Sequence, residues 1–157
     1  MQRWQLSGLD PAPFEPLFAM PDEELRHLGA LRRTADEDFG FPCRISLEDA
    51  PVGAELLLLP YEHHAAASPY RASGPIFVRR RAMRRELEPG ELPPCVTRRL
   101  ISLRAYDRAA MMIEASVTDG VAVGAAFDDL FADRAIAYVH LHNARRGCYS
   151  CRASRVG

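Results

Sequence analysis

The stretch that decides the fold is LISLRAY at Leu100–Tyr106, followed by DRA at 107–109 and AMMIEASV at 110–117. Apolar and polar side chains alternate along both flanks. Alternation with a period of two is typical of a β-strand that buries one face. The short polar link between the flanks predicts that the two strands pair as an antiparallel hairpin.

Further elements are expected on both sides of this hairpin. Other strands are predicted over 2–7, 30–35, 43–47, 55–59, 75–79, 135–143 and 148–154. Helical segments are predicted for one turn at 14–18, from Pro21 to Leu28, over 93–99 and over 120–131. Pro21 suits a first helical position, Gly29 suits a left-handed C-terminal cap, and Thr118 or Asp119 is expected to cap the last helix. Many strands with few helices predict a single α+β domain over 1–157, with a largely antiparallel sheet and two or three helices.

Composition limits the function classes. The chain has 157 residues, 20 basic and 21 acidic, and all of the basic residues are arginine. Without lysine there is neither a Schiff-base nor a P-loop lysine. The net charge of −1 argues against a dedicated nucleic-acid binder. The start of the chain lacks an apolar signal region, and the longest apolar run, Leu56–Leu59, is too short for a membrane span. Four cysteines without an export signal lead us to expect reduced thiols and a cytoplasmic protein.

The sharpest candidate for chemistry is Tyr138-Val139-His140-Leu141-His142-Asn143. On a strand, Tyr138, His140 and His142 share one face, while Val139 and Leu141 share the other. Three interpretations stay open: a metal site, a metal-free site lined by histidine, and a structural polar face. A metal would need another ligand, for which the candidates are Glu62, His63, His64 and Cys148.

A second candidate is the polar segment from Tyr61 to Pro75, which lies between two predicted strands. Arg71 offers a planar fork for a carboxylate or phosphate, and Ser73-Gly74 offers hydrogen-bond donors to an anion. The alternative is a surface loop stiffened by two prolines. On the hairpin, Arg104 shares a face with Ser102 and Tyr106. There it binds an anion, is solvated, or pairs with Glu114 across the hairpin.

Other motifs argue against common chemistries. Cys148 and Cys151 form one C-x-x-C, but no helix is predicted after it and no second pair accompanies it, so neither redox nor zinc chemistry is expected. The arginines of 79–85 are followed at once by Glu86, Glu88 and Glu91, which cancels their field. The P-loop, G-x-G-x-x-G, H-E-x-x-H and G-x-S-x-G motifs are all absent from the sequence.

Four segments carry a resemblance to a known family: FPCRISLEDA at 41–50, SPYRASGPIFV at 68–78, LRAYD at 103–107 and HLHNAR at 140–145. Together they resemble a bacterial family catalogued as a domain of unknown function, number twelve hundred and three. The resemblance covers nearly the whole chain and implies no activity. It also implies that Cys43 and Cys148 match the family's pattern whereas Cys95 and Cys151 do not, which makes the C-x-x-C incidental.

These observations predict a site for a small anionic ligand between the polar loop and the histidine strand. The candidate catalytic residues are His140, His142 and Tyr70, with a histidine transferring the proton because it titrates near neutral pH. The candidate ligand-binding residues are Arg71, Ser73, His63, His64, Arg104, Asn143 and Arg145. The alternatives are a protein-interaction module and a metal-binding module. We expect neither nucleic acid nor a membrane as partner, and the reaction, cofactor and oligomeric state stay open.

Overall fold

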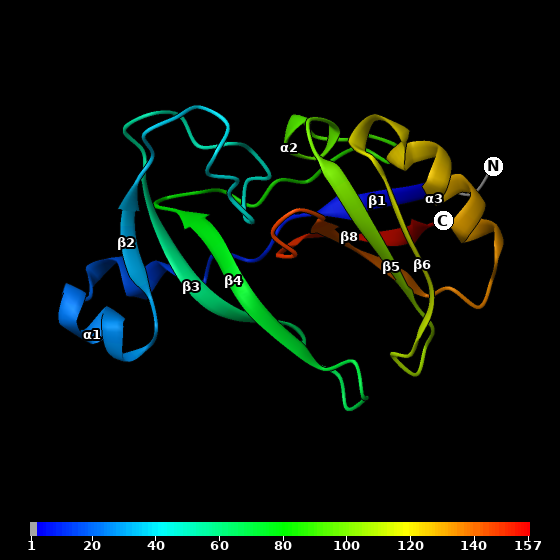
Figure 1. Cartoon of the computed structure of the whole chain (residues 1–157), viewed down its shortest axis with the longest axis horizontal. Helices are drawn as coiled ribbons and strands as arrows, with labels where there is room; N and C mark the ends of the chain where they lie inside the picture. The colour runs from blue at the N-terminus through cyan, green and yellow to red at the C-terminus, as the bar shows by residue number, and fades with distance from the viewer. Residues whose placement is uncertain (1–2) are drawn as a thin grey trace.

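The computed structural model describes residues 3–157 (Figure 1). Its strands are β1 Arg3–Ser7, β2 Leu31–Thr34, β3 Glu55–His64, β4 Ala72–Arg79, β5 Leu100–Tyr106, β6 Met112–Asp119, β7 Tyr138–Asn143 and β8 Tyr149–Val156. Its helices are α1 Asp22–His27, α2 Pro94–Thr97 and α3 Val123–Ala132, with 3₁₀ turns η1 Glu15–Ala19 and η2 Gly120–Ala122. None of the described helices is long and apolar enough to cross a membrane.

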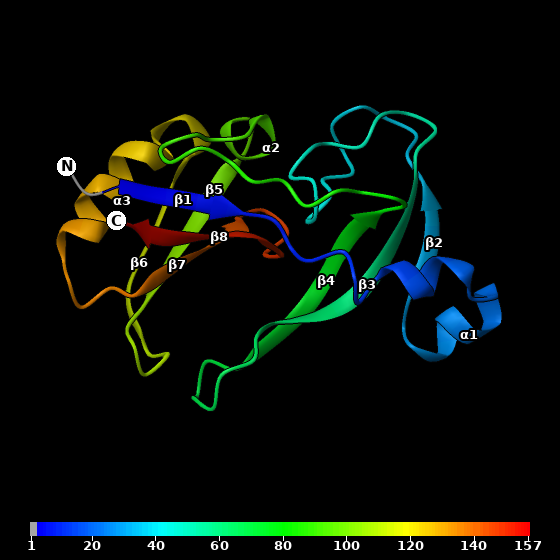
Figure 2. The same cartoon turned by 180° about the vertical axis from the view of Figure 1, so that it is seen from behind.

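The strands form two separate antiparallel sheets. The five-stranded sheet has the order β1-β8-β7-β5-β6, and the three-stranded sheet has the order β2-β3-β4. Figures 1 and 2 show the sheets beside each other, with α3 on the outer side of the larger sheet and α1 beside the smaller one. The predicted α+β class with largely antiparallel pairing is confirmed.

The larger sheet buries one face against α3. Phe127 and Phe131 of the helix pack on Leu103, Val139 and Leu141, all of which are fully buried. Trp4 of β1 contacts Phe127 edge to face, with ring centroids 4.8 Å apart. This packing uses the apolar side chains of β5 and β7, so the predicted division of faces is confirmed. The opposite face of the sheet is left to Ser102, Arg104, Tyr106, His140 and His142.

The β5–β6 hairpin forms as predicted, but β6 begins at Met112 rather than at 110. The difference lies in the turn. The Asp107 carboxylate accepts hydrogen bonds from the backbone N–H groups of Ala109 and Met111, and Ala110 adopts a φ of 60°. A side chain that satisfies two turn amides holds these residues out of the ladder.

The prediction of a strand over 43–47 is wrong. Pro42 and Cys43 form only isolated bridges, and the chain then turns so that the Leu47 amide bonds the Cys43 carbonyl at 3.0 Å. Leu47 has a φ of 55°, which a strand does not allow. The apolar side chains Ile45 and Leu47 are still buried, but each enters a different hydrophobic cluster. Alternating polarity here therefore reflects a turn between two cores.

Several boundaries also differ from the prediction. Strand β3 continues to His64 and β4 starts at Ala72, so the predicted loop shrinks to 65–71. Pro21 is the N-cap of α1 instead of its first residue, and no side-chain hydrogen bond caps η2 or α3. Strand β3 buries Leu56, Leu57 and Leu59, while Leu58 stays partly exposed. Residue 2, predicted in the first strand, lies outside the described residues.

Candidate functional site

Four histidines gather on the polar face of the larger sheet. His63 and His64 come from β3, and His140 and His142 come from β7. The His63 ring lies 4.8 Å from His142, and the His64 ring lies 5.3 Å from His140, both measured between centroids. Three tyrosine rings complete the cluster: Tyr106 from β5, Tyr138 from β7 and Tyr149 from β8. We call this group the histidine cluster.

Hydrogen bonds assign protons to two of these imidazoles. His64 donates Nδ1–H to the carbonyl of Tyr70 at 2.8 Å, and the Tyr138 hydroxyl donates to its Nε2 at 2.6 Å. His142 donates Nδ1–H to the carbonyl of Gly147 at 2.9 Å. Among the described residues, His63 Nδ1, His140 Nδ1 and His142 Nε2 are buried without a partner.

Burial disfavours the charged forms of His63, His140 and His142. Desolvation, with nearby cations and other imidazoles as smaller causes, lowers the pKa of His140 to about 2. Desolvation also lowers the pKa of His142 to about 4, and it lowers the pKa of His63. Both His140 and His142 are therefore held as neutral imidazoles at neutral pH.

The orphaned ring nitrogens do not assemble into a metal centre. Within residues 3–157, no group of three or more histidine, cysteine, aspartate or glutamate side chains is arranged to hold a metal ion. The nitrogens of His63, His140 and His142 share a cluster without sharing one coordination point.

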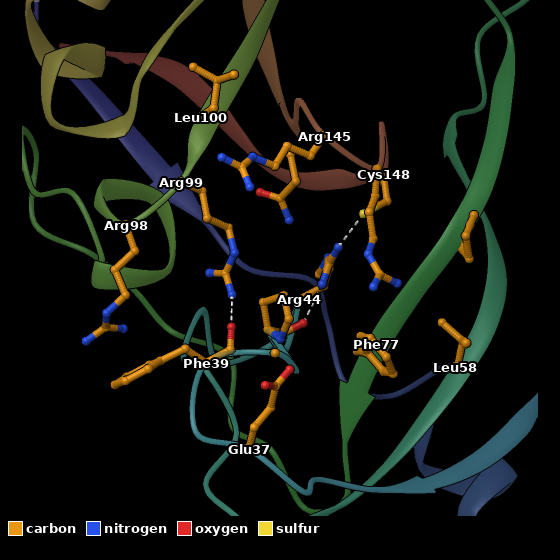
Figure 3. Close-up of a pocket in the computed structure, with 15 residues that line it drawn as sticks. Glu37, Phe39, Arg44, Leu58, Phe77, Arg98, Arg99, Leu100, Arg145 and Cys148 are labelled. Atoms are coloured by element: carbon orange, nitrogen blue, oxygen red, sulfur yellow. Dashed lines mark hydrogen bonds between the residues drawn. The ribbon is translucent and has the colours of Figure 1, made fainter.

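A cleft of about 510 Å³ lies beyond the C-terminal end of β7, where loop 35–54, the smaller sheet and the β7–β8 turn meet (Figure 3). Ligand sites typically measure about 300–1,000 Å³. The cleft is lined by five arginines, namely Arg44, Arg98, Arg99, Arg145 and Arg146. Glu37 is the one acidic residue among its described lining residues. We call it the arginine cleft.

Arg44 is almost fully buried in the centre of this cleft (Figure 3). Its guanidinium donates to the carbonyls of Tyr149 and Pro42, and it also bonds the Cys148 sulfur at 3.2 Å. Burial lowers the pKa of this guanidinium, which nevertheless stays charged in proteins. Within residues 3–157, no acidic side chain forms an ion pair with Arg44.

Arg98 and Arg99 are held rigidly on one wall. Two guanidinium nitrogens of Arg99 donate hydrogen bonds to the buried Asp49 carboxylate, at 2.6 and 3.3 Å. Arg99 also donates to the Phe39 carbonyl. Arg98 bonds the same carboxylate at 3.1 Å, and its guanidinium lies 4.1 Å above the Phe39 ring. Asp49 therefore fixes two cations at the rim of the cleft.

Arg145 and Arg146 are exposed on the turn between β7 and β8. No described acidic side chain pairs with either. The turn closes at Gly147, whose φ of 80° favours glycine, and its carbonyl receives the His142 hydrogen bond. Asn143 also lines the cleft, and its Oδ1 is buried without a described partner. The histidine cluster thus supports the turn that carries the two free arginines.

Cys148 is the one partly exposed thiol of the four, and it lines the arginine cleft. Cys43, Cys95 and Cys151 are buried, and burial raises the pKa of Cys95 to about 11 and that of Cys151 to about 12. Cys151 packs in the core beneath α3. The two cysteines of the C-x-x-C therefore occupy different environments.

The structure divides the predicted site residues into three groups. The histidine cluster contains His63, His64, His140 and His142. The Tyr70 ring lies beside it, with its centroid 6.3 Å from that of Tyr106. Arg104 lies opposite His140 in the β5–β7 ladder. The arginine cleft contains Asn143 and Arg145. Arg71 lies outside both, because its exposed guanidinium bonds Glu62 at 3.0 Å, and Ser73 lines a second hollow that adjoins the arginine cleft at Leu58 and Pro75. Arg104 does not pair with Glu114 and instead bonds Ser102 at 3.4 Å.

Sequence reasoning missed Arg44, Arg98, Arg99 and Arg146. The available signal was a repeated pair of adjacent arginines, at 98–99 and at 145–146, in regions where acidic residues are sparse. Arg44 carried no local signal, because its partners Tyr149 and Cys148 are more than a hundred residues away in the chain.

Comparison with known proteins identifies one family. No curated protein and no solved structure matches the chain. A family model described as "Protein of unknown function (DUF1203)" matches residues 40–155, a range that includes all five arginines of the cleft. Because this match spans well over half of its length, the chain belongs to the DUF1203 family of proteins of unknown function.

Proposed function

We propose that this protein binds a small anionic ligand in the arginine cleft. The observation that carries the proposal is the charge of the lining, five arginines against Glu37 alone among the described residues. Asp49 offsets part of this charge through Arg98 and Arg99. Arg44, Arg145 and Arg146 are left without a described carboxylate partner.

Electrostatics supports an anion at this place. A buried cation such as Arg44 is costly without a counter-ion, and an anion bound beside it offsets that cost. The exposed Arg145 and Arg146 add charge-assisted hydrogen bonds to the anion. Arginine presents a planar fork that matches carboxylate and phosphate oxygens. A cleft of this size fits a small molecule, and the chain's net charge of −1 is not that of a nucleic-acid binder.

We also propose a cytoplasmic location for the protein. Four free cysteines support it, since thiols persist in a reducing compartment. The partly exposed Cys148 in the cleft would otherwise be open to oxidation.

The test is titration calorimetry with inorganic phosphate and with acetate at an ionic strength of about 0.1 M, on the wild type and on the Arg145→Gln, Arg146→Gln double variant. Each charge-assisted hydrogen bond contributes about 1.5–3 kcal/mol. We therefore expect binding to the wild type and a loss of about tenfold or more in the double variant.

A matched control separates the local contact from the overall field. Arg108 and Arg134 are exposed and lie outside the cleft, so Arg108→Gln, Arg134→Gln removes the same charge elsewhere. This control should bind both anions within about twofold of the wild type, because exposed charges beyond about 10 Å are largely screened. Equal weakening in both double variants, or no binding to the wild type, would refute the proposal.

A further inference from the structure

The side of the cleft opposite the arginines is apolar. Figure 3 shows Phe77 and Leu58 on the strands of the smaller sheet, facing the arginines of the α2–β5 link and of the β7–β8 turn. Phe77 lies directly opposite Leu58 in the β3–β4 ladder, and Leu58 lies opposite Leu31 in the β2–β3 ladder. Residues paired in this way share one face of a sheet. Three strands therefore present one row of apolar side chains.

This row leads out of the arginine cleft into a second hollow. The second hollow measures about 350 Å³, and its described lining residues include no charged side chain. It shares Leu58 and Pro75 with the arginine cleft and continues over Leu31, Pro60 and Gly74. Leu31 is 38% exposed although it sits on a sheet face. The arginine cleft and the hollow thus form one groove, with cations at one end and apolar surface at the other.

From this groove we infer that the ligand is a small, free organic anion with an apolar tail, and not an inorganic ion. This inference rests on the proposed function of the arginine cleft. The carboxylate or phosphate head meets Arg145 and Arg146, and the alkyl or aryl body lies along Leu58 toward Leu31. An inorganic anion would leave the apolar half in contact with water, whereas a tail removes that surface from water.

The test is a chain-length series of straight-chain carboxylates, from acetate through butyrate and hexanoate to octanoate, measured by calorimetry on the wild type. Each buried methylene contributes about 0.8 kcal/mol. We therefore expect affinity to rise about fourfold per methylene until the tail passes the end of the second hollow. Pentylamine carries the five-carbon tail of hexanoate on a cationic head, and it should not bind.

Two variants assign the two ends of the groove. Leu31→Thr should reduce the gain per methylene while leaving acetate affinity unchanged, because Leu31 lines the second hollow and does not line the arginine cleft. Val117→Thr makes the same change on the exposed strand β6 and should leave the whole series unchanged. Arg145→Gln, Arg146→Gln should weaken every member of the series by the same factor.

The possible outcomes distinguish the two proposals. Acetate and phosphate binding without any gain from chain length would overturn this inference and leave the anion site standing. Failure of all carboxylates and of phosphate would overturn both. The wild-type series decides the question by itself, even if Leu31→Thr does not fold.

Discussion

At the scale of single residues, Cys148 is the side chain whose surroundings most affect its reactivity. It is half-exposed in the arginine cleft, beside the guanidinium of Arg44, while the other three thiols are buried. We expect iodoacetamide to modify one thiol per native molecule, as counted by intact-mass spectrometry. The Cys148→Ser variant should take up none, and unfolding in urea should expose all of the remaining cysteines.

Bound anions should slow this alkylation, because Cys148 and the arginines line the same cleft. Hexanoate at saturating concentration is expected to protect more than acetate at equal occupancy, since its tail closes the cleft more completely. Labelling of Cys43, Cys95 or Cys151 in the native protein would contradict the burial described for them.

At the scale of elements, the β6–α3 junction depends on one glycine. A Cβ added at Gly120 would lie 1.9 Å from the carbonyl oxygen of Val96, and the Gly120 amide bonds the Arg99 carbonyl at 2.7 Å. The backbone of α2 and that of η2 are therefore too close for any side chain. We expect Gly120→Ala to lower the free energy of unfolding by about 1–3 kcal/mol or more, measured by urea denaturation.

Gly124, one turn later in α3, provides the matched control. There an added Cβ would meet the Trp4 ring at 3.5 Å, which is ordinary contact. Because alanine favours a helix interior by up to about 1 kcal/mol over glycine, Gly124→Ala should leave stability unchanged or raise it. Equal destabilisation by the two substitutions would show that the α2–η2 contact is looser than described.

At the scale of the whole molecule, the histidine cluster couples stability to pH because it lies where the two sheets meet. Burial lowers the pKa of His140 to about 2 and that of His142 to about 4, and Arg104 and Arg152 add to the cost of protonation. Below pH 6.5 the unfolded chain therefore binds protons that the folded chain does not. The free energy of unfolding should fall as pH decreases, by up to about 1.4 kcal/mol per pH unit for each histidine.

Urea titrations at pH 7.5, 6.5, 5.5 and 5.0 measure this slope. Above pH 6.5 both states hold these imidazoles neutral, so their contribution should be constant. His142→Gln should remove its share of the slope between pH 6.5 and about 4. His27→Gln on the exposed surface of α1 is the matched control for replacing a histidine outside the cluster. A slope that does not change in His142→Gln would contradict the assignment.

The sequence alone predicted the elements and the division of faces. Alternation in 100–106 and 138–143 placed Leu103 and Leu141 toward the core and His140 and His142 away from it, as observed. Hydrophobic periodicity is local, so it can be recognised without knowing the fold. It was misleading at 43–47, where a φ of 55° at Leu47 turns the chain between two hydrophobic clusters.

Only the tertiary structure decided which charged residues share a site. Arg71 carried a strong local signal, yet it neutralises its neighbour Glu62 at the surface. Arg44 reaches Cys148 across more than a hundred residues, and Asp49 gathers Arg98 and Arg99 across about fifty. Such contacts depend on strand order and on the path of loop 35–54. The charge of a side chain can be read from the sequence. Whether another charge compensates it depends on neighbours that only the folded chain brings together.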